Sequence, residues 1–489
     1  MDASVILLVI PAMILLIAYL SRSRKNVPPG PPGVPLLGNL TTLKTEDMLT
    51  VLRKFHHQYG DVFSIRLFHH HIIFIGGHRT TREFLIKKGD ILGEKPYFFL
   101  GSEVFENCGV FASAGTPWKE RRAFGVASLR SFGFGKRNLQ TRIIEEVEYF
   151  HAEIDRYEGK PFDIKPLISN SIVNVISVLV FGKRFEFADP TFTELFQLWN
   201  KFFLTIPMQS PINLFPFLKY LPGDLFAYKD FRRRFDRIHE ILNNILDEHR
   251  STFDENNIRD FIDCFLQEQK KHNGSSENNT FTDKQLLVMI SEFFAAGMET
   301  TSTAIRWGIL FLMHNPEVQS RMRKEINSVI TSGRFPTLED KLELPYCEAV
   351  CFEILRLGNV APTTAPHAVK HDVELNGYVI PKSATLYIDL YSINVDPESF
   401  SDPLTFKPDR FIDEHGQLFG TDKIGSFSLG RRVCMGESMA KMELFLFMTS
   451  LVQRYQIENE RGEPLPSLEG IVGFVYSPKH YDARFIRNE

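Results

Sequence analysis

The spacing of apolar residues favours helices over most of this chain. Between residues 79 and 330 apolar positions recur mainly every three or four residues, and clusters of Gly and Pro interrupt the pattern. The longest helical pattern begins at Thr282, a residue type suited to capping a helix start, and continues to His314. An Asn-Pro pair follows, which ends a helix. The pattern therefore predicts a mainly α fold built around one unusually long helix.

Short strands are predicted near each end of the chain. Residues 62–68 and 72–76 are rich in β-branched and aromatic residues and flank three consecutive histidines at 69–71. Neighbouring side chains of an extended segment point to opposite faces, so these histidines are predicted to form a turn rather than a metal site. A second β-rich stretch, at 371–390, contains Asn376 and Gly377, a strong hairpin signal. Small β-sheets are thus expected beside the helices.

The N-terminus differs in kind from the rest. The run from Ala3 to Leu20 carries no charge and would be about 27 Å long as a helix, enough to cross a bilayer core. Basic residues follow it at positions 22, 24 and 25, which should keep that side cytosolic. A cleaved signal peptide would need a basic start, a shorter apolar run and a small-x-small site, and none is present. We predict a transmembrane signal-anchor at 1–20.

A proline-rich segment follows the anchor. Pro28 to Gly33 reads Pro-Pro-Gly-Pro-Pro-Gly, and proline cannot continue a helix, so a basic flank and a semi-rigid hinge are expected at 21–38. An SH3-type ligand is the alternative interpretation. No linker, low-complexity tract or repeat divides the remainder. A single large domain is therefore predicted at 39–489.

Composition restricts the class of protein. A chain of 489 residues with 43% hydrophobic content can bury a large core, and its net charge of −4 gives no reason to expect nucleic acid. The five cysteines are scattered and odd in number, which favours a reducing compartment without a disulfide framework. Cys347 and Cys351 lie one helical turn apart, but no further ligand pair is nearby, so core packing is expected.

The strongest chemical signal is the segment from Phe427 to Gly436. It places Cys434 on a glycine-punctuated loop with arginine nearby, just before a helical stretch. A helix start and a fixed positive charge both favour the thiolate form of cysteine. A thiolate can serve as an axial ligand of haem iron. The alternative, a buried structural cysteine beside a turn, would need neither the arginine nor the glycines.

A second signal lies in the middle of the long predicted helix. Ala296 and Gly297 are small and would let a flat cofactor or a diatomic ligand approach the backbone. Thr300 lies four residues after Ala296, so its hydroxyl can bond back to that carbonyl and open the helix locally for water. Glu299 precedes it. The alternative is a helix whose small residues serve close packing.

These two segments carry a family resemblance. Phe427, Gly430, Arg432, Cys434 and Gly436 fill every fixed position of the haem-binding signature F-x-x-G-x-R-x-C-x-G, and the chain resembles the cytochrome P450 superfamily. The segment from Ala296 to Thr301 is similar to the family's oxygen-activation motif. The resemblance implies haem b as cofactor and a cytochrome P450 fold domain, mainly α with small β-sheets, behind an N-terminal transmembrane helix.

The resemblance also implies roles for individual residues. Cys434 would be the axial ligand of the iron and Phe427 would pack beside the haem, while Thr300 and Glu299 would relay protons. Glu353 and Arg356, three apart on one helical face, would form a structural network with Arg410. The E-x-x-R spacing alone is a weak signal, because Glu153 with Arg156 and Glu458 with Arg461 share it. Further haem contacts are implied for Trp118, Arg122, Ala296, His367, Arg432 and Gly436.

Two sets of contacts are less firmly assigned by the resemblance. The family has arginine at a further propionate-binding position where this chain has Lys95, and lysine lacks the bidentate fork. Positions that line the substrate pocket in relatives correspond to Phe111, Ala296, Ala361, Ala365 and Phe474. Ordinary core packing would explain these residues equally well.

The expected activity is that of a membrane-bound haem-thiolate monooxygenase, most like family 2 of the microsomal enzymes. It would use O2 and two electrons to hydroxylate or epoxidise an apolar organic substrate, namely a fatty acid, a steroid or a xenobiotic. The chain has no dinucleotide-binding G-x-G-x-x-G after a strand. Electrons should therefore come from a separate protein. The resemblance implies that this partner is NADPH–cytochrome reductase, with cytochrome b5 as a further candidate, at the endoplasmic reticulum membrane with a cytosolic catalytic domain. The alternatives are a haem-thiolate isomerase or dehydratase acting on a peroxide and a non-catalytic haem-binding protein.

Overall fold

The computed structural model describes residues 13, 26–34, 37–40, 48–68, 70–89, 91–92, 94–97, 99–133, 137–186, 189–205, 211–213, 215–272, 280–331, 333–473 and 475–488. The predicted anchor at 1–20 lies outside these residues, apart from Met13. Within the described residues, no helix combines the length and the apolar character that a membrane crossing requires. The chain forms two compact units, and the first comprises Met1–Pro96, Pro362–Ser401 and Gly425–Val433.

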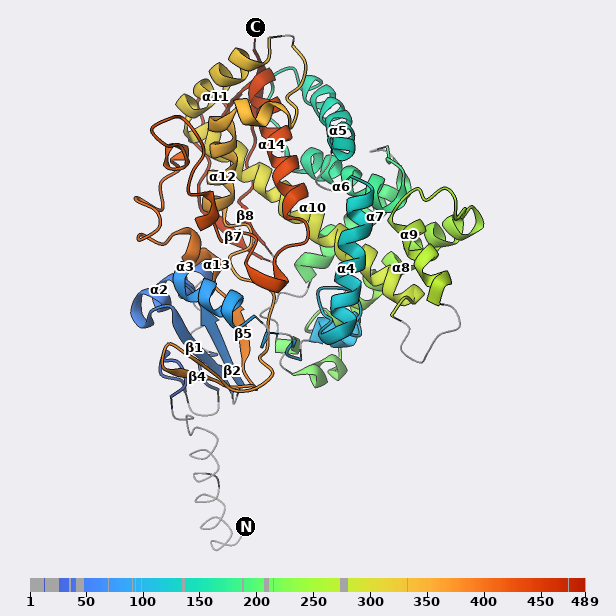
Figure 1. The fold of residues 1–489 in the computed structure, drawn as a ribbon, viewed down its shortest axis with the longest axis vertical. Coiled ribbons are helices and arrows are strands. Elements are labelled where there is room, and N and C mark those ends of the chain that lie inside the picture. Colours follow the sequence, from blue (N-terminus) through green and yellow to red (C-terminus); the bar gives the residue numbers. More distant parts are fainter. Residues whose placement is uncertain are drawn as a thin grey trace, which may run out of the picture. The chain divides into compact units, whose positions relative to one another are not determined.

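The first unit is built on a three-stranded sheet. Strands β1 (Val62–Leu67) and β2 (His70–Ile75) are antiparallel, and β2 pairs in parallel with β5 (Thr385–Ile388), in the order β1-β2-β5 (Figure 1). Short helices accompany the sheet: α2 (Met48–Tyr59), α3 (His78–Arg82), η2 (Glu83–Lys87), α13 (Leu390–Asn394) and η9 (Gly430–Arg432).

An aromatic ladder crosses this sheet. Phe63 lies opposite Phe74, and Phe74 lies opposite Tyr387. Their rings stack with centroids 5.1 Å and 5.6 Å apart. Cross-strand aromatic pairs of this kind stabilise a sheet beyond the area that they bury. The register of β1, β2 and the distant β5 is thereby fixed by side chains as well as by the backbone.

The predicted hairpin is confirmed. Strands β3 (Val373–Leu375) and β4 (Tyr378–Ile380) pair antiparallel. Asn376 and Gly377 between them both have positive φ, at 50° and 79°. This is the backbone that a two-residue hairpin turn requires, and Asn followed by Gly adopts it most readily.

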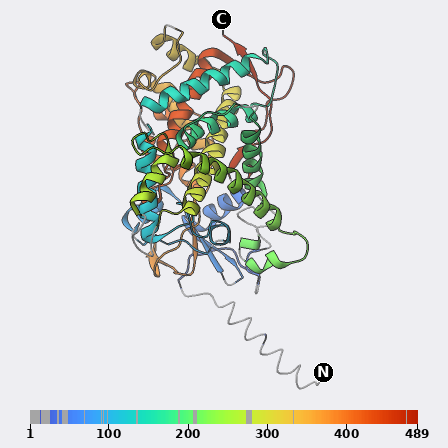
Figure 2. The same cartoon turned by 90° about the vertical axis from the view of Figure 1, so that its right-hand side faces the viewer.

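The second unit comprises Tyr97–Ala361, Asp402–Ile424 and Cys434–Glu489 and is mainly helical (Figures 1 and 2). Its longer helices are α4 (Gly115–Ser131), α5 (Arg137–Asp155), α6 (Lys165–Phe181), α7 (Pro190–Thr205), α8 (Tyr228–Ser251), α9 (Phe261–His272), α10 (Asp283–His314), α11 (Pro316–Val329), α12 (Pro345–Gly358) and α14 (Glu437–Arg454). Short helical turns are η3 (Leu100–Val104), η4 (Pro211–Asn213), η5 (Pro216–Tyr220), η6 (Asp340–Glu343), η7 (Pro408–Phe411) and η8 (Thr421–Lys423). Two antiparallel strand pairs complete it, β6 (Tyr455–Glu458) with β9 (Arg484–Arg487) and β7 (Gly470–Val472) with β8 (Tyr476–Pro478).

Helix α10 forms the axis of this unit. Its bounds match the predicted long helix, and the hydroxyl of Thr282 accepts a hydrogen bond from the backbone N–H of Gln285, as an N-cap does. The helix packs against α6, α12 and α14 (Figure 1). Nearly all residues from Thr301 to Met313 are buried, because partners cover this part of the helix on every side.

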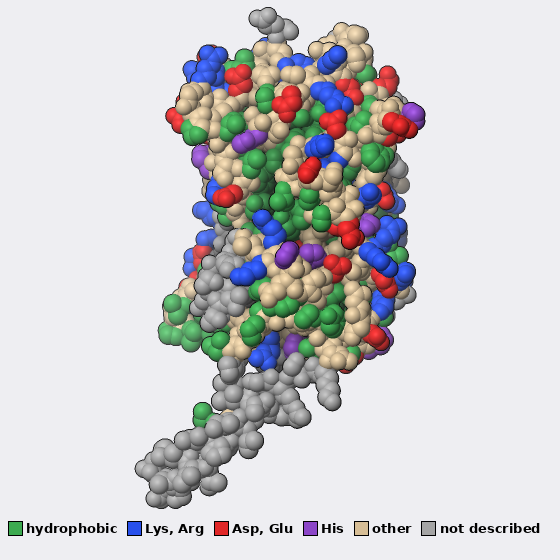
Figure 3. Space-filling model, turned by 90° about the vertical axis from the view of Figure 1, so that its left-hand side faces the viewer, with side chains coloured by type: hydrophobic (Ala, Val, Ile, Leu, Met, Phe, Trp, Pro, Cys, Tyr) green, Lys and Arg blue, Asp and Glu red, His purple; other side chains and the backbone are tan. Residues whose placement is uncertain are grey.

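Charges of both signs are mixed on the surface. On the face drawn in Figure 3, Lys and Arg side chains are interspersed with Asp and Glu. The chain as a whole has 56 Lys and Arg and 60 Asp and Glu residues, so neither sign dominates its composition. That face therefore presents no extended field of one sign.

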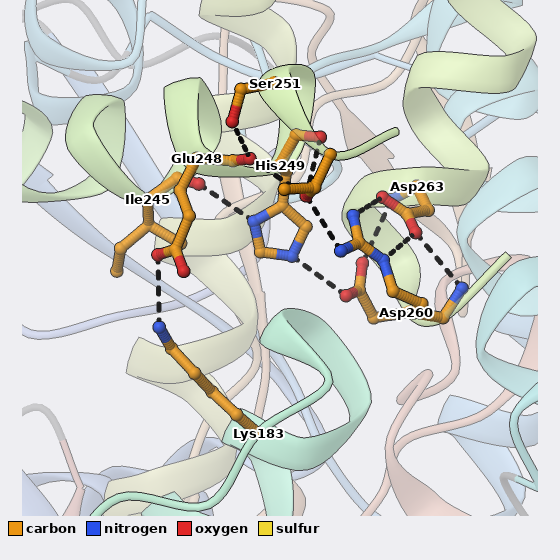
Figure 4. Close-up of polar contacts among 9 residues, drawn as sticks. Lys183, Ile245, Glu248, His249, Ser251, Asp260 and Asp263 are labelled. Carbon is orange, nitrogen blue, oxygen red and sulfur yellow. Dashed lines mark hydrogen bonds and ion pairs between the residues drawn. The ribbon is translucent and has the colours of Figure 1, made fainter. Parts of the chain in front are cut away.

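A buried polar cluster joins the end of α8 to the start of α9 (Figure 4). His249 Nε2 lies 2.9 Å from Asp260 Oδ2, and His249 Nδ1 lies 2.8 Å from the carbonyl oxygen of Ile245. The two side chains of this pair are 7% and 1% exposed. Asp263 is held by Arg259, which donates to both carboxylate oxygens. The three acidic or imidazole groups could enclose a metal ion, but every one of them already has a protein partner.

The hydrogen bonds of His249 require a charged ring. A carbonyl and a carboxylate both accept hydrogen bonds, so each ring nitrogen must carry a proton. Burial lowers the pKa of His249, whereas the hydrogen bond and charge of Asp260, the carbonyl of Ile245 and the charge of Asp263 raise it, and the net pKa is raised above its ordinary value. The pair is therefore a buried imidazolium–carboxylate bridge at the C-terminus of α8, where a positive charge is also favourable.

This bridge predicts a stability that depends on pH. A raised pKa in the folded state means that the bridge stabilises fully below the ordinary histidine pKa and loses its effect as pH rises through the folded value. Replacing His249 by Leu should lower stability by about 3 kcal/mol at pH 6, because Asp260 is left as an unpaired buried charge. Thermal unfolding followed by circular dichroism from pH 6 to pH 9 should show the difference between the two proteins shrinking.

The exposed His415, replaced by Leu, is the matched control, because 78% of its side chain is accessible. The His415→Leu variant should have the same thermal unfolding midpoint as the parent at every pH. A difference between the His249→Leu variant and the parent that stayed constant over the whole pH range would contradict the charged bridge.

Candidate active site

The sulfur of Cys434 is held at the start of α14. The backbone N–H groups of Gly436 and Glu437 hydrogen-bond to it. Burial and the charge of Glu437 raise the pKa of the Cys434 thiol, while these two N–H groups and Arg122 lower it, and the net shift is upward. The side chain is nonetheless exposed to solvent. The sulfur thus combines an accessible position with donors that favour its anion.

Space is left open beside this sulfur. Gly436 has an ordinary negative φ of −86°, so its backbone does not require glycine. A Cβ placed there would contact only Cys434 Sγ, at 3.8 Å. Neither conformation nor packing demands a glycine at this position. The observation fits a requirement for room next to the sulfur.

Helix α4 contributes an aromatic ring and a guanidinium. Trp118 is buried, and the guanidinium carbon of Arg122 lies 5.9 Å from the centroid of its ring. Burial lowers the pKa of Arg122, and the thiolate charge of Cys434 raises it. The structure therefore brings Arg122 into the electrostatic range of Cys434, although 312 positions separate them in the sequence.

The middle of α10 has one accessible stretch within a buried helix. Ala296 is exposed and Thr300 is half-buried, whereas Phe294, Met298 and Thr301 are buried. The hydroxyl of Thr300 donates to the carbonyl oxygen of Ala296 at 2.7 Å, the back-bond expected from the sequence. The small side chain at 296 therefore faces open space.

Gly297, the residue after Ala296, has a role in helix packing. A Cβ on Gly297 would lie 2.5 Å from Cδ1 of Ile176 on α6. The glycine thus permits the close crossing of α6 and α10, so packing explains it without any ligand. This contact supports the alternative of close packing for Gly297, while the approach of a cofactor to the backbone there stays a prediction.

Glu299 points away from solvent. It is 9% exposed, and burial raises its pKa, while Lys165 of α6 and Arg306 of α10 lower it. Since the net pKa lies above the ordinary value, the carboxyl can hold a proton at a higher pH than a surface glutamate does. A buried carboxyl next to Thr300 can therefore store and release a proton.

The first unit carries a second set of predicted cofactor contacts. His367 is 4% exposed, and its Nδ1 has no hydrogen-bond partner among the described residues. Burial, Lys95 and Arg432 together lower the pKa of His367 well below its ordinary value. Lys95 Nζ donates to the carbonyl oxygen of Pro366 at 2.9 Å. Two cationic residues and a neutral, unsatisfied histidine are thus gathered in one place.

The loop that carries Arg432 has one position that only glycine can fill. Gly430 has a φ of +74°, and a Cβ there would lie 2.5 Å from the carbonyl oxygen of Leu85. Glycine is required on both counts. Phe427 and Ala365, also in this unit, are half-buried.

Glu353 is shared by two arginines. Arg356 donates to both of its oxygens, at 2.7 Å and 2.8 Å, and Arg410 Nε donates to Oε1 at 3.1 Å. The backbone N–H of Lys407 adds a fourth hydrogen bond at 2.8 Å. The three side chains are 0%, 0% and 5% exposed. The cluster ties α12 to the segment around η7, and the two other E-x-x-R matches lie at the surface.

Glu292 of α10 was not anticipated from the sequence. Its carboxylate accepts hydrogen bonds from the backbone N–H groups of Val110, at 2.6 Å, and Phe111, at 3.0 Å. Gly109 has a φ of +74°, and a Cβ there would collide with the same carboxylate. Burial raises the pKa of Glu292 to about 7, although the loop N–H groups and Arg121 lower it. The only sequence signal that could have indicated this role was a glutamate two helical turns before Thr300, and glutamates are common on helices.

The predicted substrate contacts differ in their exposure and in the unit to which they belong. Phe111 lies in the loop held by Glu292 and is half-buried, as is Ala361. Ala296 is exposed. Phe474 lies outside the described residues, and Ala365 belongs to the first unit.

Comparison with known proteins identifies the family. A family model described as cytochrome P450 matches residues 28–485. The chain is 34% identical to cytochrome P450 2C11 of Rattus norvegicus, over 99% of this chain and 98% of the relative. It is 36% identical to cytochrome P450 2D20 of Mesocricetus auratus, with 96% of each covered, and 35% identical to cytochrome P450 2B4 of Oryctolagus cuniculus, with 97% and 99% covered.

The chain belongs to the cytochrome P450 family, and the relatives at this level of identity are members of its family 2. It is a cytochrome P450 monooxygenase with haem as its cofactor. The resemblance drawn from Cys434 and the motif of α10 is thus confirmed, as is the mainly helical fold with small sheets.

The residues present fit this cofactor. Haem needs a thiolate donor, a flat space and cations for its carboxylates. Cys434 supplies an accessible sulfur, and a Cβ at Gly436 would meet no atom other than that sulfur. Ala296 supplies an exposed small residue in an otherwise buried helix. The unsatisfied Nδ1 of His367 lacks the partner that a carboxylate would provide.

The Glu353 cluster predicts a large loss of stability when it is broken. Replacing Glu353 by Ala leaves two buried guanidinium groups without their carboxylate and should cost about 3–5 kcal/mol. Thermal unfolding of the holoprotein measures the effect. Glu153→Ala is the matched control, because Glu153 and Arg156 have the same spacing at the surface and should contribute less than about 1 kcal/mol. Equal effects of the two substitutions would contradict the assignment.

The Glu292 clamp predicts a change in local dynamics. In Glu292→Gln one acceptor becomes a donor, so at least one loop N–H of residues 110–111 loses its partner. Amide hydrogen exchange there should quicken by about tenfold, as expected when a buried hydrogen bond is lost. Glu248→Gln, which alters an exposed pair with Lys183, should leave this exchange unchanged. Unaltered exchange in both variants would show that the carboxylate does not hold the loop.

Proposed function

We propose that this chain is a membrane-bound, family 2-like monooxygenase that hydroxylates or epoxidises an apolar organic substrate with O2 and two electrons. One oxygen atom enters the substrate, and the other leaves as water with two protons. The observation that carries the proposal is the conjunction, within one unit, of an accessible sulfur at the start of α14 and an exposed, back-bonded turn in α10.

The bound haem supplies the iron chemistry that activates O2. Cys434 would hold its iron, and the N–H groups of Gly436 and Glu437 stabilise the sulfur as the anion. By family resemblance, the haem carboxylates would be bound by Arg122, Trp118, His367 and Arg432. A guanidinium suits a carboxylate because it can donate two parallel hydrogen bonds. Lys95 keeps the charge of the family's arginine but donates instead to Pro366.

The chain would deliver protons through Thr300 and Glu299. The Thr300 hydroxyl donates to Ala296 and can exchange that acceptor for a reacting oxygen or a water molecule. Glu299 has a raised pKa, so it can replace the proton that the hydroxyl gives up. The two residues are neighbours on a helix turn in which Ala296 is exposed, Thr300 is half-buried and Met298 is buried.

Electrons would come from a separate protein. By family resemblance the donor is NADPH–cytochrome reductase, with cytochrome b5 as a second candidate. The predicted anchor at 1–20 and hinge at 21–38 would place the domain at 39–489 on the cytosolic side of the endoplasmic reticulum membrane. Reductase and substrate would then meet the enzyme at one surface.

The proposed substrate class is supported by the residues at positions that line the pocket in relatives. Ala296 and Ala361 are small, and Phe111 is aromatic and carried by the clamped loop. Both oxygens of Glu292 face loop N–H groups, so this carboxylate is not available to pair with a cationic substrate. An uncharged apolar molecule, such as a fatty acid chain, a steroid or a xenobiotic, fits such a lining.

Replacing Cys434 by Ser tests the proposal directly. The parent, reduced under carbon monoxide, should show the Soret band of thiolate-ligated haem, and the variant should lose it because a hydroxyl is a poor anionic ligand. In vesicles with reductase, the parent should consume NADPH and O2 together. Thr300→Ala should keep the band while releasing more peroxide per NADPH, because a side chain positioned for proton transfer is lost.

A Soret band that survived in the serine variant would overturn the assignment of the sulfur. Turnover of an organic peroxide without reductase, in a parent that consumes no NADPH, would instead support the isomerase alternative. A parent inactive in both assays would indicate a haem-binding protein without catalysis.

A further inference from the structure

Helix α13 of the first unit is preceded by a buried acid with one unsatisfied oxygen. Oδ1 of Asp389 accepts a hydrogen bond from the backbone N–H of Ser392 at 3.1 Å, whereas Oδ2 has no hydrogen-bond partner among the described residues. The residue is 1% exposed. A neutral asparagine could accept the same hydrogen bond without placing a charge in the interior. The start of the helix alone therefore does not explain the acid.

An imidazole on α2 faces the same region. Nδ1 of His56 is buried and has no hydrogen-bond partner in the part of the chain that the structure describes, while Nε2 lies 3.7 Å from Oδ1 of Asp61. A Cβ on Gly76, directly after β2, would lie 3.1 Å from His56 Nδ1 and 2.4 Å from Ser392 Oγ. Helices α2 and α13 pack together, so His56 and Asp389 approach each other from the two sides of this glycine.

The charges around Asp389 have opposing effects. Burial and the charge of Asp61 raise its pKa, whereas the hydrogen bonds from α13 and the charge of His56 lower it, and the net effect raises the pKa of Asp389 to about 6. Arg53 of α2 is also near α13, with its guanidinium carbon 5.3 Å from the centroid of the Tyr391 ring. The carboxyl therefore exchanges its proton near neutral pH.

The start of α13 is tied to a segment that leads to a predicted haem contact. Asp389 pairs with Thr363 in an isolated β-bridge, and the N–H of Tyr391 donates to the carbonyl oxygen of Pro362 at 2.9 Å. Residues 362–364 carry no ionisable side chain and are followed closely by His367. The seating of α13 thus affects the placement of this segment.

The end of α13 is tied to the loop that precedes Cys434. Oδ1 of Asn394 accepts from the N–H of Gly425 at 2.8 Å, and Nδ2 donates to Ser426 Oγ at 3.0 Å. Asn394 is 0% exposed. Phe427, another predicted haem contact, follows directly. Helix α13 therefore forms a strut between two segments that each carry predicted haem contacts.

We propose that Asp389 and His56 form a proton-operated switch that controls how firmly α13 holds the segments at 362–367 and 425–432. With a proton on Asp389, the carboxyl is neutral and compatible with its buried position. Without this proton a charge is buried that His56 offsets only in part, and α13 is less firmly held. A rise in pH should therefore loosen both segments, because the folded state retains this proton more strongly than the unfolded chain does.

The test follows backbone amide hydrogen exchange of the holoprotein from pH 5 to pH 8. Exchange rates are converted to protection factors, which removes the intrinsic effect of pH. In the parent, protection at 362–368 and 425–428 should fall about tenfold as pH rises through about 6, since a pKa raised by one unit changes an equilibrium tenfold. Helix α5, in the second unit, should show no such step.

Three substitutions should change the step in different ways. Asp389→Asn keeps an acceptor but cannot titrate, so protection should stay high throughout. His56→Gln removes a charge that lowers the pKa of Asp389, so the step should move to higher pH, whereas Asp61→Asn removes a charge that raises it and should move the step to lower pH. The matched control is His57→Gln, because His57 is the exposed neighbour of His56, and it should leave the step unchanged.

Release of haem to an excess of apomyoglobin shows whether the switch reaches the haem contacts. The rate in the parent should rise across the same pH range as the loss of protection, and Asp389→Asn should abolish this rise. A parent without the step in hydrogen exchange, or a step that persists in Asp389→Asn, would overturn the switch. A step in exchange with no counterpart in haem release would overturn its connection to the haem contacts.

Discussion

The N–H groups at the start of α14 impose the constraint on which the proposed active site depends. Two of them, from Gly436 and Glu437, point at the sulfur of Cys434 and stabilise its anion without any flexible side chain. The helix must therefore begin at a fixed residue, and its packing against α10 and α12 keeps that beginning in place. The Glu353 cluster supports the same arrangement from α12, because two guanidinium groups converge on one buried carboxylate.

Much of the framework could be predicted from local sequence. Thr282 caps the long helix where its side chain indicated, and Asn376 with Gly377 makes the expected hairpin, because both signals act within a few residues. The signature around Cys434 was sufficient to identify the family. Only the structure explains why its glycines are there. Gly430 has a positive φ and lies too close to the carbonyl oxygen of Leu85 for any side chain, whereas Gly436 leaves space beside the sulfur of Cys434.

Features that depend on distant partners could not be predicted. Gly297 was expected to face a ligand, yet its neighbour is Ile176, about 120 positions earlier in the chain. Glu292 looks like an ordinary helical glutamate, and only its tertiary contacts show that it holds the loop at Val110 and Phe111. Among the three E-x-x-R matches, burial and not spacing separates Glu353 from the surface pairs.

The hydroxyl groups of α10 have a mechanical consequence. At Ala296 and Met298 a side-chain oxygen competes with a backbone N–H for the same carbonyl. Such a turn can exchange donors without unwinding, so the helix is compliant there and stiff on either side. Molecules of different thickness could then be accommodated by a small bend of α10 at this turn. The two ends of the helix and the elements packed against them would keep their geometry.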